Sequence, residues 1–325
     1  MQTAYTLGEQ LLRLTQQVHE TALLSAAHRV LGTTLCYLGE IALAHTHLTQ
    51  GIALYDPQQH RTSAFLYGQD TGVSCRSYAA WTLWFLGYPA QGLTRSQEAV
   101  TLAQQIAYLY SLAFALGAAA MFHQFRCEAH ATQERAEAVM RLATEQGFPF
   151  WKAHGSILRG WALAQQGQAQ AGLAQCHQGL TAWRATGAEG LRPYFLALLA
   201  DAHGVQGEPE EGLTALTEAL TLVDTTGERW YEPELYRLKG ALLLQQSPDN
   251  YAEAEHCFQK AMVIAQNQQA KSWELRAATS LVRLWQQQGK RQAAYDLLAP
   301  IYGWFTEGFN TADLQDAKAL LEALA

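Results

Sequence analysis

The stretch GSILRGWALAQQGQAQAGLAQCHQGLTAW, residues 155–183, decides the fold of this chain. It contains two helical runs joined at Gly167, a residue type that permits the left-handed conformation that ends a helix. Gly172 and Gly179 lie seven residues apart, which is two helical turns, so they share one face of the second helix. Gly160 lies in the first helix. Because residues this small let helices approach closely, the stretch predicts a tightly packed helical hairpin.

Small residues recur at the same stations along the whole chain, about every 40 positions. Three columns carry the pattern: Gly32, Ala80, Ala119, Gly160, Ala200 and Gly240; then Ala44, Gly92, Ala131, Gly172, Gly212, Ala254 and Ala294; then Gly51, Ala99, Ala138, Gly179, Ala219 and Ala261. The steps in the first column are 48, 39, 41, 40 and 40 residues. A repeat of this length cannot bury its own apolar face and must stack on copies of itself.

The sequence therefore predicts an all-α, right-handed superhelical solenoid in a single domain, residues 1–325. We expect an unpaired N-terminal helix within residues 1–22, about seven helix pairs over residues 23–308, and a capping helix within residues 309–325. An unpaired first helix suggests that the chain is part of a longer protein, or that this helix packs on something else.

Glycines mark most of the expected turns inside the pairs. They are Gly39, Gly87, Gly167, Gly207 and Gly289. The third module has Arg126-Cys127-Glu128 in place of this glycine, and the extra residues between the first two modules predict a longer loop over 56–72. Thr311 is placed to cap the last helix, with Asp313 and Asp316 near its N-terminal end.

Composition agrees with a helical protein and excludes several classes of function. Apolar residues make up 49% of the chain, charged residues 16%, and the net charge is −7. No run of Lys or Arg forms the basic stripe that nucleic-acid binding needs. The five cysteines are dispersed and unpaired in spacing, which favours reduced thiols and a cytoplasmic location. The uncharged stretches 77–94 and 106–122 fall in register with the repeat, so we interpret them as buried helices, not membrane spans.

The period of 40 with small residues at these points resembles a long form of the tetratricopeptide repeat. The resemblance is specific from residue 65 onward, in the segments FLYGQDTGVSCRSYAAWTLWFLGYP, ATEQGFPFW, WRATGAEGLRPYFLALLADAHG, TGERWYEPELYRLKGALLL and LAPIYGWFTEGFNTADLQDAKALL. It covers about four-fifths of the chain. The chain is similar to the C-terminal tetratricopeptide region of large bacterial signalling proteins. These proteins join a nucleotide-cyclase-like or regulatory domain to a signal-transduction ATPase. The resemblance implies a sensor or interaction arm in signal transduction and carries over no catalytic residue.

The sequence offers no catalytic or metal motif, so we expect neither an enzyme nor a bound cofactor or metal. A GxxxxGK[ST] phosphate loop, HExxH, CxxC and GxSxG are all absent. His45 and His47 point in different directions on a helix, and we interpret them as exposed polar residues. Neither Cys176 with His177 nor His256 with Cys257 is expected to bind zinc.

A candidate binding groove follows from the family property that first helices line the inside of the superhelix. The residues that share the inward stripe on these helices are Arg29, Trp81, Trp84, His123, His154, Trp161, Tyr194, Asp201, Glu234, Arg237, Arg276 and Arg283. Tyr, Trp and Arg are the residues that most often anchor partners. The hypothesis is a groove that stacks apolar groups centrally and holds a carboxylate near Arg276 and Arg283. The alternative is that Trp81 and Trp161 are core residues, as we expect for Trp183, Trp230, Trp285 and Trp304.

We therefore predict a non-catalytic interaction or ligand-sensing module. Its partner would be a protein, a peptide segment or a small effector bound in the concave groove, with no nucleic acid and no membrane. An upstream ATPase or cyclase domain would be regulated by this binding. The alternative is a scaffold for self-assembly, in which exposed helices at the N-terminal end pair with another copy.

Overall fold

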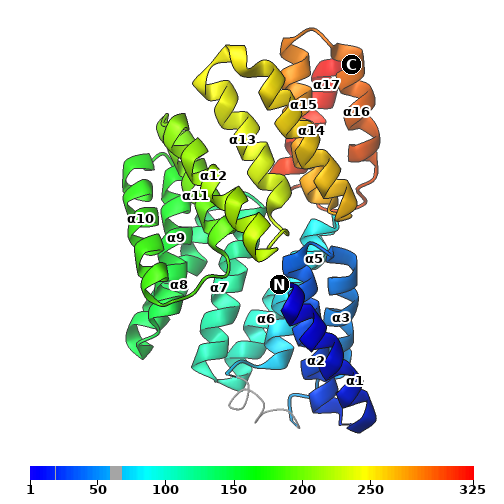
Figure 1. The fold of residues 1–325 in the computed structure, drawn as a ribbon, viewed down its shortest axis with the longest axis vertical. Coiled ribbons are helices and arrows are strands. Elements are labelled where there is room, and N and C mark those ends of the chain that lie inside the picture. Colours follow the sequence, from blue (N-terminus) through cyan, green and yellow to red (C-terminus); the bar gives the residue numbers. More distant parts are fainter. Residues whose placement is uncertain (19, 59–67) are drawn as a thin grey trace.

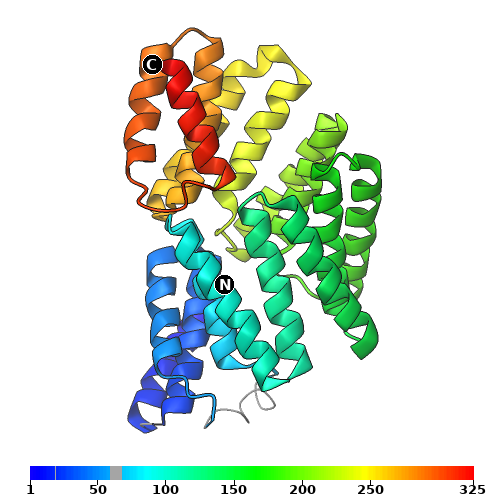
Figure 2. The same ribbon diagram turned by 180° about the vertical axis from the view of Figure 1, so that it is seen from behind.

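The computed structural model describes residues 1–18, 20–58 and 68–325, and all regular structure in these ranges is helical. The elements are α1 (Gln2–Val18), α2 (Thr21–Leu38), α3 (Ile41–Ala53), α5 (Thr71–Phe85), α6 (Pro89–Ile106), α7 (Leu109–Phe125), α8 (Ala129–Gln146), α9 (Pro149–Gln165), α10 (Ala169–Ala185), α11 (Arg192–Gln206), α12 (Pro209–Thr226), α13 (Glu232–Gln246), the short 3₁₀ helix η1 (Pro248–Asn250), α14 (Tyr251–Asn267), α15 (Lys271–Gln287), α16 (Arg291–Gly303) and α17 (Ala312–Leu324). They stack as a right-handed superhelical solenoid, seen from two sides in Figures 1 and 2.

The helices form antiparallel neighbours in chain order. The hairpins are α2 with α3, α5 with α6, α7 with α8, α9 with α10, α11 with α12, α13 with α14, and α15 with α16. At the two ends, α1 packs on α2, and α17 packs on α15 and α16. The long loop predicted over 56–72 falls largely on residues 59–67, which lie outside the described residues.

The turns and close contacts follow the small residues of the repeat. Gly167 has φ 85°, and Cys127 takes the same left-handed position in the third module with φ 58°. A Cβ on Gly160 would stand 2.7 Å from the carbonyl oxygen of Gly172, and a Cβ on Gly172 would stand 2.5 Å from that of Gly160. These separations are shorter than any real Cβ contact, so α9 and α10 can pack at this distance only because both positions are glycine.

The superhelix closes on itself, because the last modules return to the first. Figure 1 shows the C-terminal modules against the end of α5, where α15 contacts α5. The Ser272 hydroxyl donates to the Trp84 carbonyl oxygen, and the Arg229 amide donates to the Tyr37 carbonyl oxygen at 2.7 Å. The Glu307 carboxylate accepts from the Ala90 amide at 2.9 Å. These contacts join segments about 190 or more residues apart in the chain.

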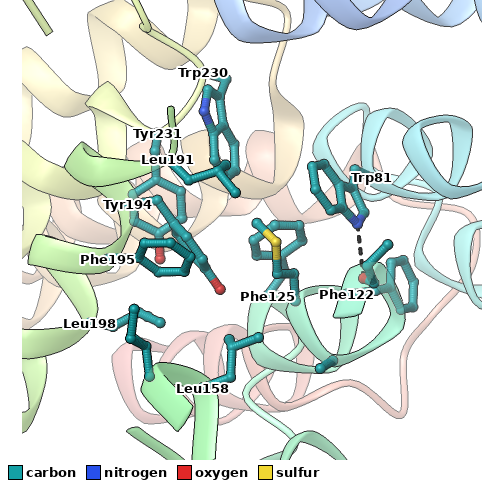
Figure 3. Close-up of a cluster of buried hydrophobic side chains, with 14 of the residues drawn as sticks. Trp81, Phe122, Phe125, Leu158, Leu191, Tyr194, Phe195, Leu198, Trp230 and Tyr231 are labelled. Carbon is teal, nitrogen blue, oxygen red and sulfur yellow. Dashed lines mark hydrogen bonds between the residues drawn. The ribbon is translucent and has the colours of Figure 1, made fainter. Parts of the chain in front are cut away.

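Aromatic side chains fill the inside of the closed superhelix, so the expected open groove is not present at its centre. Trp84 and Trp273 lie with ring centroids 4.7 Å apart, and Phe125 contacts both rings. Figure 3 shows Trp81, Phe125 and Tyr194 from α5, α7 and α11 converging with Trp230 and Tyr231 from the turn before α13. The reason is residue size: the large rings of the first helices meet at the centre and bury one another.

Three smaller expectations can be compared with the structure. Thr311 is the residue before α17, but its side chain makes no capping bond and donates instead to the Gly308 carbonyl oxygen at 2.7 Å. Trp183 and Trp230 are buried as expected, whereas Trp304 is 37% exposed. Among the helices that the structure describes, none is both long and apolar enough to cross a bilayer.

Candidate binding cavities

Eight of the twelve predicted groove residues divide between two separate hollows. Trp81 and His154 line an apolar hollow formed mainly by α5, α7 and α9, which we call the aromatic cavity. Trp161 and Asp201 lie with the four C-terminal members of the predicted set in a charged hollow, which we call the polar cleft. The sequence placed all of them on one inward stripe, but the closure of the superhelix separates them.

The aromatic cavity has a volume of about 510 Å³. Its lining is Tyr37, Gly68, Gln69, Tyr78, Trp81, Tyr108, Tyr110, Phe114, Ala118, Met121, Phe150, Trp151, His154 and Leu191. This volume lies in the range of small-ligand sites, roughly 300–1,000 Å³, which are mostly lined by apolar and aromatic side chains.

Ring contacts and hydrogen bonds hold the walls of the aromatic cavity in place. The Trp81 indole nitrogen donates to the Ala118 carbonyl oxygen at 3.0 Å, the bond drawn as a dashed line in Figure 3. The hydroxyls of Tyr37 and Tyr78 are hydrogen-bonded at 2.8 Å, and the Tyr78 ring meets Trp81 edge to face at 4.9 Å. A wall fixed in this way is formed before any ligand arrives.

The lining residues that the structure describes for the aromatic cavity carry no formal charge. Among its described lining residues there is no Asp, Glu, Lys or Arg. Burial lowers the pKa of His154 to about 3, so its imidazole is neutral near pH 7. Two polar atoms on this lining have no hydrogen-bond partner in the described part of the chain, Trp151 Nε1 and His154 Nδ1.

The polar cleft is smaller, with a volume of about 240 Å³. Its lining is Gln124, Cys127, Trp161, Gln165, Asp201, Glu234, Arg237, Arg276, Thr279, Ser280, Arg283, Asp313 and Asp316. These include three arginines and four acids, so the charges nearly cancel and one negative charge is left over.

Arg276 is the central residue of the polar cleft, and its guanidinium is bonded within the chain. It donates to both carboxylate oxygens of Asp313, at 3.0 Å from Nε and 2.6 Å from Nη2. Nη2 also donates to the Phe125 carbonyl oxygen at 2.6 Å. The guanidinium carbon lies 5.2 Å from the Trp84 ring centroid and 5.1 Å from that of Trp273, within cation–π range.

The other charged groups of the cleft are paired in the same way. Arg237 makes two bonds of 2.8 Å to the Glu234 carboxylate, and Arg283 is bonded to Asp316. Burial alone would raise the pKa of Glu234, but Arg237 and Arg276 lower it. The sequence assigned Asp313 and Asp316 only to the start of the capping helix. In the structure their carboxylates pair with the two arginines that were expected to hold a ligand carboxylate.

The acid nearest the middle modules is held by neutral donors. Asp201 Oδ2 accepts from Trp161 Nε1 at 2.7 Å and from Gln165 Nε2 at 2.8 Å. Burial raises the pKa of Asp201, although the Trp161 bond opposes this. Trp161 itself is only 3% exposed, so its indole is a buried residue with one polar contact at the cleft.

Four predicted groove residues lie in neither hollow. Trp84 and Tyr194 are fully packed in the central aromatic cluster, and the Tyr194 hydroxyl donates to Gln124 Oε1 at 3.0 Å. Arg29 is half-buried in α2, and His123 bonds to Glu128 Oε2 at 2.6 Å. The prediction that Trp84 and Tyr194 line a groove is therefore wrong, because both side chains are packed in the core.

The histidines also differ from the sequence interpretation. His45 and His47 are half-buried, not exposed: His45 Nδ1 lies 3.0 Å from Thr82 Oγ1, and His47 Nδ1 lies 3.0 Å from His28 Nδ1. His203 is hydrogen-bonded to Glu208 at 2.9 Å, five residues along, which repeats the spacing of His123 and Glu128. Within the described ranges, no group of three or more His, Cys, Asp or Glu side chains is placed to hold a metal ion.

Sequence reasoning missed most of the aromatic cavity, although a signal for it exists. Tyr110, Trp151 and Leu191 line it from successive modules at steps of 41 and 40 residues. Tyr37 and Tyr78, which share a hydrogen bond, are also 41 residues apart. Applying the repeat period to large apolar and aromatic residues as well as to small ones would have grouped them.

No protein-family model matches the chain, and no curated protein matches it. Solved structures resemble it in fold: aspartyl phosphate phosphatase F from Bacillus subtilis has a TM-score of 0.53 at 11% identity, over 89% of this chain and 73% of that one. A Rap protein complexed with competence and sporulation factor has a TM-score of 0.53 at 9% identity, over 93% of this chain and 97% of that one.

A third solved structure is a signal-transduction ATPase with numerous domains and a tetratricopeptide repeat sensor, from Pyrococcus horikoshii. It has a TM-score of 0.48 at 12% identity, over 98% of this chain and 46% of that one. At these identities the likeness concerns the fold alone, a tetratricopeptide-like solenoid of helical hairpins.

Proposed function

We propose that this chain is a non-catalytic binding module that takes a peptide or protein segment, or a small effector, in the aromatic cavity. The observation that carries the proposal is the cavity itself: about 510 Å³ of preformed space, walled by aromatic side chains on the first helices of adjacent modules. Pockets of this kind are the default ligand sites of unassigned structures.

The polar cleft is the weaker candidate because its charges already have partners. Arg276 and Arg237 direct their donors to Asp313 and Glu234. A ligand carboxylate would have to displace these acids, which are themselves partly buried. We therefore place the ligand at the aromatic cavity and assign the polar cleft to the closure of the superhelix.

One similar structure supports a binding role for this fold. The Rap protein that the chain resembles is complexed with competence and sporulation factor. In our proposal the present chain likewise engages a partner through its solenoid, as a cytoplasmic sensor arm. The sequence resemblance to signalling proteins suggests that the output is an attached ATPase or cyclase-like domain.

The mechanism follows from the closed form. A ligand in the aromatic cavity would contact α5, α7 and α9 together, and α5 is also the helix that meets α15. Binding would therefore favour one arrangement of the N-terminal modules relative to the C-terminal ones. Any domain that packs on α1 would then respond to this population shift.

The test is a screen of a random dodecapeptide library on the folded chain, followed by a matched pair of variants. Tyr110→Glu places a charge on the half-buried rim of the aromatic cavity, and Tyr295→Glu makes the same change at a 40%-exposed tyrosine in α16. We expect selected peptides to lose at least tenfold in affinity with Tyr110→Glu and to be unaffected by Tyr295→Glu. Peptides that bind both variants equally would place the site elsewhere, and a screen without binders would contradict the proposal.

A second candidate, self-assembly, is favoured by the exposed face of α1. Leu7, Leu11, Leu14 and Val18 are between 37% and 60% exposed and follow the 4-3-4 spacing of a coiled-coil seam. Light scattering of the isolated chain at concentrations between about 1 and 200 μM measures its oligomeric state. A dimer that Leu7→Glu with Leu14→Glu converts to a monomer supports assembly, and a concentration-independent monomer excludes it.

A further inference from the structure

Another hollow of the molecule lies between α6 and α8, across one face of α7, and has a volume of about 280 Å³. We call it the α6–α8 groove. Its polar side chains come from all three helices: Ser96, Gln97, Thr101 and Gln104 from α6, His123 from α7, and Arg135 from α8. A hollow lined mainly by side chains that can donate hydrogen bonds, with a guanidinium among them, has the composition of an anion site.

We infer that the α6–α8 groove binds a phosphate group, which pairs with the Arg135 guanidinium and accepts hydrogen bonds from the Ser96 and Thr101 hydroxyls. The inference does not depend on the proposed function, because this groove and the aromatic cavity lie on different faces of α7. Ala118 lines the aromatic cavity, and the next residue, Ala119, lines the groove. Small phosphate esters and phosphorylated peptides both carry the group, so both sources are tested.

The buried donor that indicates a ligand is the Ser96 hydroxyl. Ser96 is only 5% exposed and lines the groove, yet its hydroxyl has no hydrogen-bond partner among the described residues. Its Oγ is not sealed off, in contrast to Ser77 Oγ, which is completely covered. Thr94, in the same helix, already donates to the Ala90 carbonyl oxygen at 3.3 Å. Ser96 therefore presents a free donor that a ligand in the groove can reach, and so does Thr101, whose hydroxyl is likewise unbonded within the described residues.

The positive charge of the groove comes from Arg135. Its guanidinium is half-buried and makes neither an ion pair nor a hydrogen bond with the described residues. The positions three and four residues away in α8 offer no acid, since they are Ala131, Thr132, Ala138 and Val139. Arg159, by contrast, donates to Glu137 Oε1 at 2.8 Å. Arg135 is therefore available to an anion, and the guanidinium fork matches the oxygens of a phosphate.

The acid bonded to the lining does not cancel this charge. Glu128 Oε2 lies 2.6 Å from His123 Nδ1, and Glu128 Oε1 accepts from Arg126 Nε at 2.8 Å. Burial would raise the pKa of Glu128, but its bonds with His123 and Arg126 lower it to about 2, so the carboxylate is ionised near pH 7. Its negative charge is offset by Arg126, which leaves the charge of Arg135 for a ligand.

The arrangement of the donors favours a phosphate over a carboxylate. The hydroxyls of Ser96 and Thr101 come from the α6 wall, and the guanidinium of Arg135 comes from the α8 wall. A phosphate monoester carries a charge of about −1.5 to −2 near pH 7 and presents three terminal oxygens in different directions, so it can meet both walls at once. A carboxylate has a single charge and two oxygens in one plane.

The experiment compares two matched pairs of probes by ligand-observed NMR titration of the folded chain in a buffer free of phosphate. The small pair is methyl phosphate and acetate. The peptide pair is a blocked pentapeptide of alanines around one phosphoserine, and the same peptide with aspartate at that position. We expect each phosphate probe to bind at least about tenfold more tightly than its carboxylate counterpart. The tighter of the two phosphate probes identifies the source that fits better.

Two pairs of variants place the phosphate in the groove. Arg135→Gln should weaken the phosphate probes by at least about tenfold, because it removes a charged donor. Arg141→Gln makes the same change in α8 at an exposed arginine outside the groove, and should leave binding within about twofold. Ser96→Ala should weaken binding by about 3- to 10-fold, whereas Thr94→Ala removes a hydroxyl that α6 already uses and should have no effect.

Three results would overturn the inference. They are no binding of either phosphate probe, binding of a carboxylate probe that equals or exceeds that of its phosphate counterpart, and phosphate binding that Arg135→Gln or Ser96→Ala leaves unchanged. Circular dichroism and urea denaturation of each variant verify that it is folded, so a loss of binding is not mistaken for a loss of structure. The peptide test at Tyr110 is unaffected by any of these results, since Tyr110 lines the aromatic cavity.

Discussion

The aromatic cavity and the polar cleft lie in one solenoid, yet they treat polar groups in opposite ways. In the polar cleft Arg276 meets Asp313, Glu234 and the Phe125 carbonyl oxygen, and the neighbouring arginines are paired too. In the aromatic cavity the described lining has no charged side chain, and Trp151 Nε1 has no acceptor among the described residues. Paired charges therefore identify the polar cleft as the structural centre of this molecule, and the aromatic cavity is the better candidate for binding.

Replacing Arg276 should have the largest effect on the stability of the fold. Arg276→Met keeps an unbranched side chain between Trp84 and Trp273 but leaves the Asp313 and Glu234 carboxylates without this cation. Breaking a buried ion pair on one side costs about 3–5 kcal/mol. Arg283→Met, at a side chain that is 53% exposed, should cost less than about 1 kcal/mol. Urea denaturation measures both, and equal losses would show that the polar cleft is not a structural centre.

Low pH should lower the stability of the fold, partly by protonating His154 in the wall of the aromatic cavity. The folded-state pKa of His154 is lowered to about 3, below the unfolded value near 6.5, so the unfolded chain binds more protons between these values. The contribution of neutral His154 to the free energy of unfolding is complete above pH 6.5. It is lost as the pH falls towards 3, with a slope of about 1.4 kcal/mol per pH unit.

In His154→Gln that part of the slope should disappear between pH 6 and 4, as measured by urea denaturation at a series of pH values. His28→Gln is the comparison variant outside both hollows. Burial also lowers the pKa of His28, to about 4, so this variant should lose its own part of the slope. An unchanged slope in His154→Gln would mean that His154 is not kept neutral by burial.

The sequence was sufficient for the fold because its signal is periodic. Gly160 and Gly172 lie where the repeat places them, and each approaches the other's backbone as only glycine can. The candidate site was harder to derive, because a stripe on one helix does not reveal how far the superhelix curls. Trp84 points inward as expected, but the return of α15 buries it under Trp273 and Arg276.

The partners of the charged residues were also beyond reach of local patterns. Arg276 and Asp313 are 37 residues apart and belong to different helices, α15 and the capping helix α17. By contrast, the bond between His203 and Glu208 spans five residues across one turn and recurs at His123 and Glu128. Our sequence analysis identified no partner for either histidine, although the same five-residue spacing is present at both positions. Contacts within one module can be predicted from the repeat, and contacts that close the superhelix cannot.

A pair of tryptophan variants should differ in their effect on stability. Trp161→Phe leaves Asp201 with one donor fewer, whereas Trp151→Phe removes an N–H that has no acceptor among the described residues. Both lose similar aromatic area, so Trp161→Phe should be the more destabilising by about 1–3 kcal/mol in urea denaturation. Equal losses in the two variants would show that the bond from Trp161 to Asp201 does not stabilise the polar cleft.

The surface contact between Glu307, in the C-terminal modules, and the start of α6 should have the smallest effect on stability. Glu307 accepts from the amides of Ala90 and Gln91 at 2.9 and 3.0 Å, at the start of α6, where the preceding residue Tyr88 provides no capping bond. Glu307→Ala should therefore cost about 0.5–2 kcal/mol, as the loss of an N-terminal cap does.

Hydrogen exchange measures this last change directly. The Ala90 and Gln91 amides should exchange faster in Glu307→Ala, while Glu322→Ala, at an exposed acid 3.8 Å from Lys318, should leave them unchanged. If the loss also weakens the binding of peptides selected on the folded chain, the closing contact and the aromatic cavity are coupled through the N-terminal modules. Unchanged exchange at both amides would show that Glu307 does not hold the C-terminal modules against α6, and that the contacts of Ser272, Arg276 and Arg229 keep the superhelix closed without it.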